Sequence, residues 1–261
     1  MIVDAHCHVW PDAIAERALK LPVGELRRFA DGKVSSRLAE MDRAGVDRAV
    51  CLAVADAPER LDGANRFVAS LPDRFIGFGS VHPGASVEEN LDSLRRHGLR
   101  GVKVHPLFQS YSLEDPALGR ILDALQGEFL ATIHVGEGGT AEDNRRCTPA
   151  MLARLCREFP RLEIIACHFG GYKLLDAVEE QIVGLPVNID TSWSPSLAVL
   201  DPGRVRSLIE RHGPDRVIFG SDWPMAEQAA EIAAVEALGL DAVDTAAVLG
   251  GNFGRLLASV E

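Results

Sequence analysis

The 261-residue sequence lacks any apolar run of about 18 residues, the length that a membrane-spanning helix requires, so we expect no membrane association. Its N-terminus lacks a basic region followed by an apolar segment and a cleavage site, so no signal peptide is expected. Basic residues are few: 27 lysines and arginines stand against 38 aspartates and glutamates, for a net charge of −11. This acidic balance argues against binding to nucleic acid, whose phosphates attract basic surfaces.

Cysteine is also sparse. The chain has five cysteines, an odd number at scattered positions, and they never form a Cys-x-x-Cys motif. This distribution argues against a disulfide framework and predicts reduced thiols in a cytoplasmic protein. Cys7 and Cys167 alternate with histidine neighbours, so both thiols are expected to face away from the histidine side of their strands.

Short apolar segments alternate with helical patterns along the whole chain. We expect eight strands, over 2–9, 48–54, 75–81, 100–105, 129–135, 162–169, 186–192 and 216–222. Near-continuous apolar strands between helices indicate a parallel sheet that is buried on both faces. Eight βα units in roughly 250 residues are typical of an α/β protein of the TIM (β/α)8 barrel type.

The alternative is an open, doubly wound sheet. That fold often carries a Gly-rich phosphate loop after its first strand, whereas here the first strand runs into His-Cys-His-Val-Trp. No linker, low-complexity tract or short repeat divides the sequence. Residues 1–261 are therefore expected to form a single barrel domain.

Two histidines open the chain. His6 and His8 are one residue apart at the end of the first expected strand, where residues i and i+2 point to the same face. Two convergent imidazoles can bind a divalent metal such as zinc. The pair alone is equally compatible with one buried and one surface histidine.

Other polar residues end other expected strands. They are Lys103 and His105 on the fourth strand, His134 on the fifth, His168 on the sixth and Asp222 on the eighth. Active sites of TIM barrels lie at the C-terminal ends of the strands. If the barrel closes, the eighth strand lies beside the first, so Asp222 neighbours His6 and His8 while His134 approaches from across the mouth. The sequence thus predicts a metal site at the C-terminal ends of the strands.

Six ordered motifs span nearly the whole chain. They are Val-Asp-Ala-His-Cys-His at 3–8, Gly-Val-Lys-Val-His-Pro at 101–106, Ile-His-Val-Gly at 133–136, Ala-Cys-His-Phe-Gly-Gly at 166–171, Phe-Gly-Ser-Asp-Trp-Pro at 219–224 and Leu-Gly-Gly-Asn-Phe-Gly-Arg-Leu-Leu at 249–257. The set resembles the amidohydrolase superfamily. More closely, it resembles the amidohydrolase-related branch that contains aminocarboxymuconate-semialdehyde decarboxylase and several lactone hydrolases.

The resemblance implies a barrel with a divalent metal and a catalytic His168. The implied metal ligands are His6, His8, His134 and Asp222. A metal in such a site lowers the pKa of a bound water toward neutrality. Asp222 or His168 can take the remaining proton, and the metal or protonated His168 can polarise a carbonyl.

This chemistry favours a metal-dependent hydrolase acting on a small carboxylated lactone, ester or amide. The alternative is a metal-dependent decarboxylase of an unsaturated or aromatic carboxylic acid, in which the metal and His168 assist protonation of the substrate carbon. A metal-dependent nuclease of similar barrel design is disfavoured by the acidic charge and by Lys103, which stands where an acidic ligand is expected.

Lys103 leaves the number of metals open. In two-metal members of the superfamily, a carboxylated lysine at this strand bridges the metals and His168 becomes a ligand. In the single-metal branch a Lys-x-His-Pro segment occurs without a bridging role, and its ammonium can bind a substrate carboxylate or carbonyl oxygen. We expect one divalent metal, zinc, with a second metal on a carboxylated Lys103 as the alternative.

The substrate pocket is the least determined part of the sequence pattern. With Lys103, we predict substrate contacts from His105, Trp193 and Trp223, since a flat apolar wall suits a cyclic or aromatic substrate. His105 is equally compatible with a structural role, and either tryptophan can pack under a loop. Asp4 is expected to be structural and hydrogen-bonded within the barrel. The predicted partner is a small-molecule substrate, and a homo-oligomer is among the assembly states that the sequence leaves open.

Overall fold

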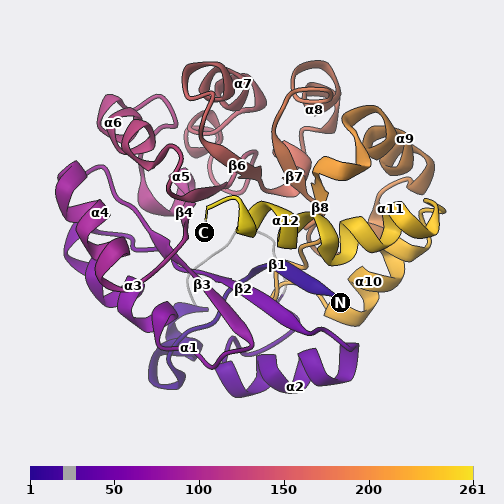
Figure 1. Ribbon diagram of the computed structural model, residues 1–261, viewed down its shortest axis with the longest axis horizontal. Helices are drawn as coiled ribbons and strands as arrows, with labels where there is room; N and C mark the ends of the chain where they lie inside the picture. The colour runs from indigo at the N-terminus through magenta and orange to yellow at the C-terminus, as the bar shows by residue number, and fades with distance from the viewer. Residues whose placement is uncertain (20–27, 261) are drawn as a thin grey trace.

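The computed structural model describes residues 1–19 and 28–260 and shows eight parallel strands ringed by helices (Figure 1). The strands pair in sequential order from β1 to β8. They are β1 (Val3–Cys7), β2 (Arg48–Leu52), β3 (Phe75–Ser80), β4 (Gly101–Val104), β5 (Leu130–Ile133), β6 (Glu163–Ala166), β7 (Asn188–Asp190) and β8 (Val217–Ile218). Every expected strand is present, and each is shorter than its apolar run.

Helices follow the strands, and most of them cover the outside of the barrel. They are α1 (Asp12–Ala18), α2 (Val34–Ala44), α3 (Leu61–Ala69), α4 (Val87–Arg96), α5 (Pro106–Gln109), α6 (Pro116–Leu125), α7 (Pro149–Glu158), α8 (Leu175–Gln181), α9 (Pro202–His212), α10 (Gln228–Glu236), α11 (Ala242–Ala246) and α12 (Asn252–Ala258). Several begin at a side-chain cap followed by proline, as at Asp115, Thr148 and Asp201. Across the described ranges, no helix is long and apolar enough to cross a bilayer.

Hydrogen bonds between β1 and the segment that continues β8 close the barrel. Ala5 N donates to Phe219 O at 2.9 Å, Asp222 N to His6 O at 2.9 Å, and His8 N to Trp223 O at 2.7 Å. The TIM-barrel prediction is therefore confirmed. The same bonds bring Asp222 alongside His6 on β1 and His8 just after it.

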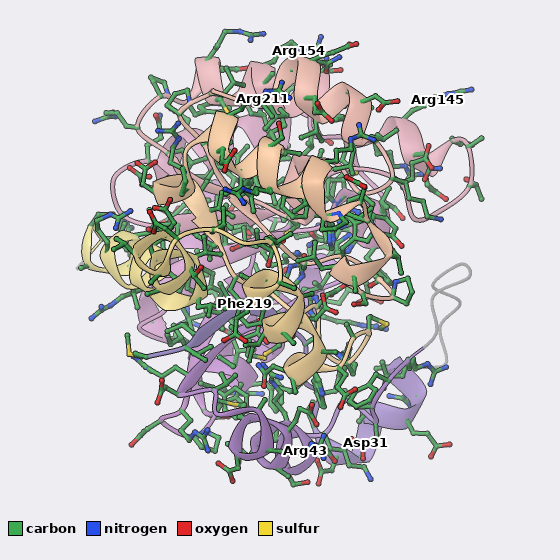
Figure 2. The ribbon with its side chains drawn as sticks, turned by 90° about the vertical axis from the view of Figure 1, so that its right-hand side faces the viewer. Asp31, Arg43, Arg145, Arg154, Arg211 and Phe219 are labelled. Atoms are coloured by element: carbon green, nitrogen blue, oxygen red, sulfur yellow. The ribbon has the colours of Figure 1, made fainter. Side chains whose placement is uncertain are left out.

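The apolar interior of the barrel lies below the polar mouth. It is formed by Val3, Ala5, Val50, Leu52, Phe78, Leu130, Ile165 and Ile218, with Phe253 and Leu256 from α12. In Figure 1, α12 crosses the centre of the ring of helices and covers this end. Figure 2 shows Asp31 and Arg145, which follow β1 and β5, at the opposite end. Loops that follow strands therefore gather at this opposite end, where the polar mouth lies.

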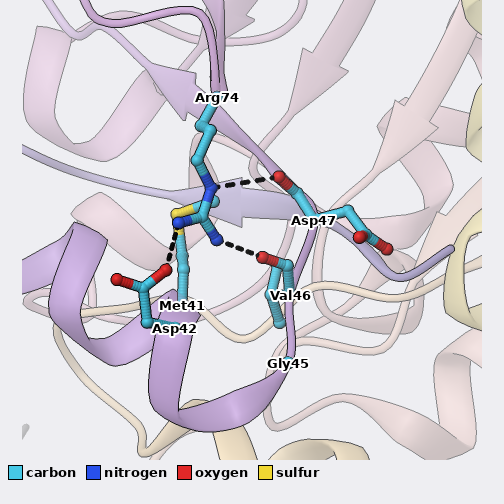
Figure 3. Close-up of a pocket in the computed structure, with 6 residues that line it drawn as sticks. All are labelled: Met41, Asp42, Gly45, Val46, Asp47 and Arg74. Carbon is cyan, nitrogen blue, oxygen red and sulfur yellow. Dashed lines mark hydrogen bonds and ion pairs between the residues drawn. The ribbon is translucent and has the colours of Figure 1, made fainter.

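A hollow at the N-terminal ends of the strands is lined by Arg74 (Figure 3). Its guanidinium pairs with the Asp42 carboxylate and donates to the carbonyl oxygens of Val46 and Asp47. These bonds tie the turn between α2 and β2 to the start of β3. Since barrel active sites lie at the other end of the strands, we assign this hollow a structural role.

An irregularity in β1 separates Asp4 from the histidines. The register between β1 and β2 shifts between Asp4 and Cys7, which indicates a bulge. Asp4 is fully buried and accepts hydrogen bonds from Arg37 Nη2 at 2.6 Å, Gln228 Nε2 at 2.7 Å and Ser221 Oγ at 2.5 Å. Asp4 is thus hydrogen-bonded as expected, but its partners include α2 and α10 behind the barrel wall.

The Asp4–Arg37 pair yields a stability prediction. Arg37→Met is expected to lower the free energy of unfolding by about 3–5 kcal/mol, because it leaves a buried carboxylate without its countercharge. Urea denaturation measures the loss. The matched control is Arg60→Met, which breaks the exposed pair with Asp56 and should cost at most about 1 kcal/mol. Equal losses in the two variants would contradict the assignment.

Candidate metal centre

The inward-facing residues at the C-terminal ends of the strands form one polar ring. The structure brings there most of the residues that the sequence predicted: His6, His8, Lys103, His105, His134, His168 and Asp222. Each is buried, except His8, which is half-buried. The ring rests on the apolar barrel interior, so its groups are largely withdrawn from water.

His6, His8 and Asp222 form a compact group of potential ligand atoms. Asp222 Oδ1 lies 3.4 Å from His6 Nε2 and 3.7 Å from His8 Nε2. One ligand atom from each residue lies within 4.8 Å of the others. His8 Nδ1 donates to Leu52 O at 3.0 Å, which leaves its Nε2 for the centre. Two imidazoles and a carboxylate are a donor set that zinc prefers.

The local backbone explains how Asp222 reaches the histidines. Gly220 lies two residues before Asp222, in the segment that continues β8. A Cβ at this position would lie 2.8 Å from the Cβ of His6, so only glycine allows the two chains to approach this closely. Asp222 itself has a φ of 59°, which directs the chain out of the strand. Ser194 Oγ donates to Asp222 Oδ2 at 3.2 Å, so Oδ1 remains directed at the imidazoles.

His134 lies beside this group but outside it. Its ring stacks on His105 with centroids 4.3 Å apart, and its Nδ1 is 3.1 Å from His168 Nε2. Its buried Nε2 has no partner among the described residues. A buried imidazole nitrogen without a partner fits a metal ligand, and the residues of the ring therefore suit a metal. His134 as the fourth ligand stays a prediction.

Lys103 is fully buried and directed at the centre. Its Nζ lies 3.3 Å from His6 Nε2 and donates to Cys167 Sγ at 2.9 Å. The expectation that Cys167 faces away from the site was therefore wrong. Cys167 continues the inward alternation of Ile165, which belongs to the barrel interior.

His168 reaches the centre by a different route. Its φ is 58°, and Phe169 follows with a φ of 57°, so the chain leaves the strand direction at this point. Left-handed backbone at two successive non-glycine residues is uncommon and is typical of functional sites. The turn lets two successive side chains, Cys167 and His168, enter the same mouth. The ring centroids of His168 and His6 are 5.3 Å apart.

The three predicted substrate contacts other than Lys103 differ in their packing partners and in their burial. His105 Nδ1 has no hydrogen-bond partner in the described part of the chain, and the ring packs edge-on against Phe108. Trp193 packs on Tyr172 with centroids 5.0 Å apart and is almost wholly covered. Trp223 is fully buried, with the Arg37 guanidinium 5.4 Å from its ring centroid. Trp223 therefore packs with α2 behind the barrel wall and presents no surface to a substrate in this structure.

Asp190 was missed by the sequence reasoning. It ends β7, is fully buried, and its Oδ2 lies 2.8 Å from His6 Nδ1. Its Oδ1 accepts hydrogen bonds from His168 N at 2.8 Å and from Ser192 N at 3.1 Å. The signal that identified the other site residues, a polar residue at a strand end, was also present here.

Burial sets the protonation of the ring before a metal binds. It lowers the pKa of His6 and His134 well below the usual value, that of His8 to about 3 and that of His168 to about 4. The Lys103 charge acts in the same direction on all four. Neutral imidazole is the form that binds metal. Burial raises the pKa of Asp222 to about 7, against the opposing effect of Lys103.

A pH dependence of metal binding follows from Asp222. Below pH 7 a metal has to displace its proton, so the apparent zinc affinity is expected to rise about tenfold per pH unit from pH 5.5 to 7 and to level off above pH 7. Competition with a chromophoric chelator measures the affinity. Asp222→Asn should bind more weakly and lose this slope, and an unchanged slope in that variant would contradict the assignment.

The fold and the ring define a TIM-barrel protein with a candidate metal centre at its mouth. The amidohydrolase family model matches residues 3–258, so the chain belongs to the amidohydrolase family and is an enzyme of that superfamily. The chain is 27% identical over 256 residues to an L-fucono-1,5-lactonase from Burkholderia ambifaria, covering 87% of this chain and 81% of the lactonase.

Two solved structures share the fold. A 5-carboxyvanillate decarboxylase from Sphingomonas paucimobilis has a TM-score of 0.72, 19% identity and coverage of 98% of both chains. A probable 2-pyrone-4,6-dicarboxylic acid hydrolase from Acinetobacter baumannii has a TM-score of 0.69 and 17% identity, covering 98% of this chain and 99% of that one. The predicted superfamily is confirmed, and these neighbours fit the predicted branch.

Proposed function

We propose that the protein is a metal-dependent hydrolase that uses metal-activated water on a small carboxylated lactone, ester or amide. The observation that carries the proposal is the convergence of His6 Nε2, His8 Nε2 and Asp222 Oδ1 in a buried mouth. The similarity to a lactonase and the shared fold of a pyrone-dicarboxylic acid hydrolase support it.

His6, His8 and Asp222 would hold the metal, with His134 as the fourth ligand. When bound, a divalent metal supplies a water of lowered pKa and polarises a carbonyl. The neighbouring Lys103 ammonium would attract a substrate carboxylate or carbonyl oxygen into the mouth. The surrounding burial excludes bulk water and strengthens these electrostatic contacts.

His168 would move the proton. Its lowered pKa, to about 4, keeps the ring neutral at pH 7, so it can accept a proton from the attacking water. The second oxygen of Asp222, which accepts a hydrogen bond from Ser194 Oγ, can share this task. The proton is then available to the alkoxide or amine that leaves when the acyl bond breaks.

Decarboxylation is the second candidate. The buried Lys103 ammonium would bind a substrate carboxylate, and His168, once it has taken a proton from solvent, would deliver that proton to the carbon that loses CO₂. This alternative is supported by the fold that the chain shares with a 5-carboxyvanillate decarboxylase and a 2,6-dihydroxybenzoate decarboxylase.

One paired assay separates the two reactions. The zinc-loaded protein is offered a panel of carboxylated and sugar lactones and a panel of aromatic and unsaturated carboxylic acids, in water enriched in ¹⁸O. Ring opening with one ¹⁸O atom in the product is expected. Release of CO₂ without incorporation of water oxygen would overturn the hydrolase proposal in favour of the lyase.

The proposed function implies a metal count, a kind of partner and a cellular location. We propose one zinc per chain, with a second metal on a carboxylated Lys103 as the alternative that metal analysis distinguishes. A small molecule is the proposed partner, and the net charge of −11 disfavours nucleic acid. A cytoplasmic location is proposed because all five cysteines are free thiols.

A further inference from the structure

Asp190 is the most heavily hydrogen-bonded side chain in the candidate centre, and the proposed mechanism does not use it. Both oxygens of its buried carboxylate are engaged. Oδ2 faces His6 Nδ1 at 2.8 Å, while Oδ1 accepts from His168 N at 2.8 Å, Ser192 N at 3.1 Å and Ser192 Oγ at 2.5 Å. Oδ2 therefore faces an imidazole ring, whereas Oδ1 accepts from two backbone N–H groups and a hydroxyl group.

We propose that Asp190 is a positioning residue that holds His6 in the Nδ1–H tautomer and so presents the bare Nε2 to the metal centre. This inference rests on the proposed role of His6 as a metal ligand. A carboxylate oxygen accepts a hydrogen bond, so the proton of a neutral His6 resides on Nδ1. The opposite nitrogen, Nε2, is then bare. It lies 3.4 Å from Asp222 Oδ1 and 3.3 Å from Lys103 Nζ, an ammonium that can only donate to it.

The remaining contacts of Asp190 explain why aspartate is needed rather than its amide. Oδ1 accepts two backbone N–H groups, which cannot reverse their direction. In an Asp190→Asn variant the amide oxygen therefore has to occupy the Oδ1 position, and the NH₂ group faces His6 Nδ1. An NH₂ donor requires a bare Nδ1, so the His6 proton moves to Nε2 and points at the metal centre.

The same hydrogen-bond reasoning fixes two further rings. His168 Nδ1 lies 3.1 Å from Ser192 O, which only accepts, so a neutral His168 carries its proton on Nδ1. Its bare Nε2 then accepts from His134 Nδ1 at 3.1 Å. His134 is left with a bare Nε2, the buried nitrogen that lacks a partner among the described residues. Residues of and just beyond β7 thus orient ligands from β1 and β5.

His8 provides an internal control. Its Nδ1 donates to Leu52 O at 3.0 Å rather than to Asp190. A general disturbance of the mouth would affect both β1 histidines, whereas loss of the proposed contact affects His6 alone. The matched control variant is Glu231→Gln, which converts another buried carboxyl to an amide on α10, where its oxygen accepts from Leu197 N.

The test is long-range ¹H–¹⁵N NMR of the histidine rings in the full-length, metal-free protein, with resonances assigned by single histidine substitutions. In the wild type we expect the Nδ1–H tautomer at His6, His8, His134 and His168. In Asp190→Asn we expect His6 to change to Nε2–H while His8 keeps Nδ1–H. Glu231→Gln should leave every ring unchanged.

Zinc affinity, measured by competition with a chelator, gives a second readout. Asp190→Asn is expected to weaken binding by about 10- to 100-fold, the usual effect of losing a group that orients a metal ligand. An Nε2–H tautomer at His6 in the wild type, or an unchanged His6 tautomer in Asp190→Asn, would overturn the inference. If the variant does not fold, the wild-type spectrum alone still shows which nitrogen of His6 carries the proton. A wild type that turns over without metal would refute the proposed function but leave the tautomer result standing.

Discussion

Asp222→Asn is expected to reduce turnover at least about 10³-fold and to lower the metal content of the purified protein. Asp222 Oδ1 faces the Nε2 atoms of both His6 and His8. The amide removes the negative charge that a divalent cation needs. It also removes a proton acceptor from the mouth. No other substitution in the ring combines both losses.

The measurements are kcat on the substrate found in the lactone panel and zinc per chain. Asp215→Asn is the matched control, because that aspartate lies at the far end of β8, is largely exposed and should leave both quantities unchanged. Turnover of Asp222→Asn within tenfold of the wild type would contradict the assignment of this residue to the centre.

His168→Asn is expected to separate metal binding from catalysis. Metal should be retained, since His6, His8 and Asp222 form a ligand group without His168. Turnover should fall by about 10²–10⁴-fold, the usual contribution of a general acid or base. Asparagine preserves polarity and much of the side-chain volume, but it cannot accept a proton at pH 7.

Metal analysis and kcat measured on the same preparation test this separation. His97→Asn is the control, since His97 pairs with Asp62 at the end of α4, outside the mouth. Loss of metal together with turnover in His168→Asn would favour the two-metal alternative, in which His168 is a ligand and Lys103 is carboxylated.

The barrel was predictable because eight apolar segments and their helices follow one another along the chain. The positions at which the strands end were less predictable. The run over 216–222 suggested a long last strand, but β8 spans only Val217–Ile218. Beyond it, Phe219 turns to partners on β1 and in the segment after α11, and Asp222 adopts a positive φ. Tertiary pairing, which apolar periodicity does not encode, ends the strand.

The site residues were predictable where a histidine or lysine marked a strand end. Strict alternation failed at two places. The bulge in β1 places Asp4 behind the wall although it shares the parity of His6, and the left-handed turn at His168 admits both Cys167 and His168 to the mouth. Asp190 was overlooked because a single aspartate after an apolar run is common, and its importance depends on contacts with residues more than twenty positions away.

We propose that the barrel mouth holds one catalytic metal. The most direct test of this proposal is the metal content per chain of the purified protein, determined by mass spectrometry and located by anomalous diffraction at the zinc edge. We expect one zinc, bound by His6, His8, His134 and Asp222, beside an unmodified Lys103. A protein that contains no metal and keeps full turnover after exhaustive chelation would contradict it.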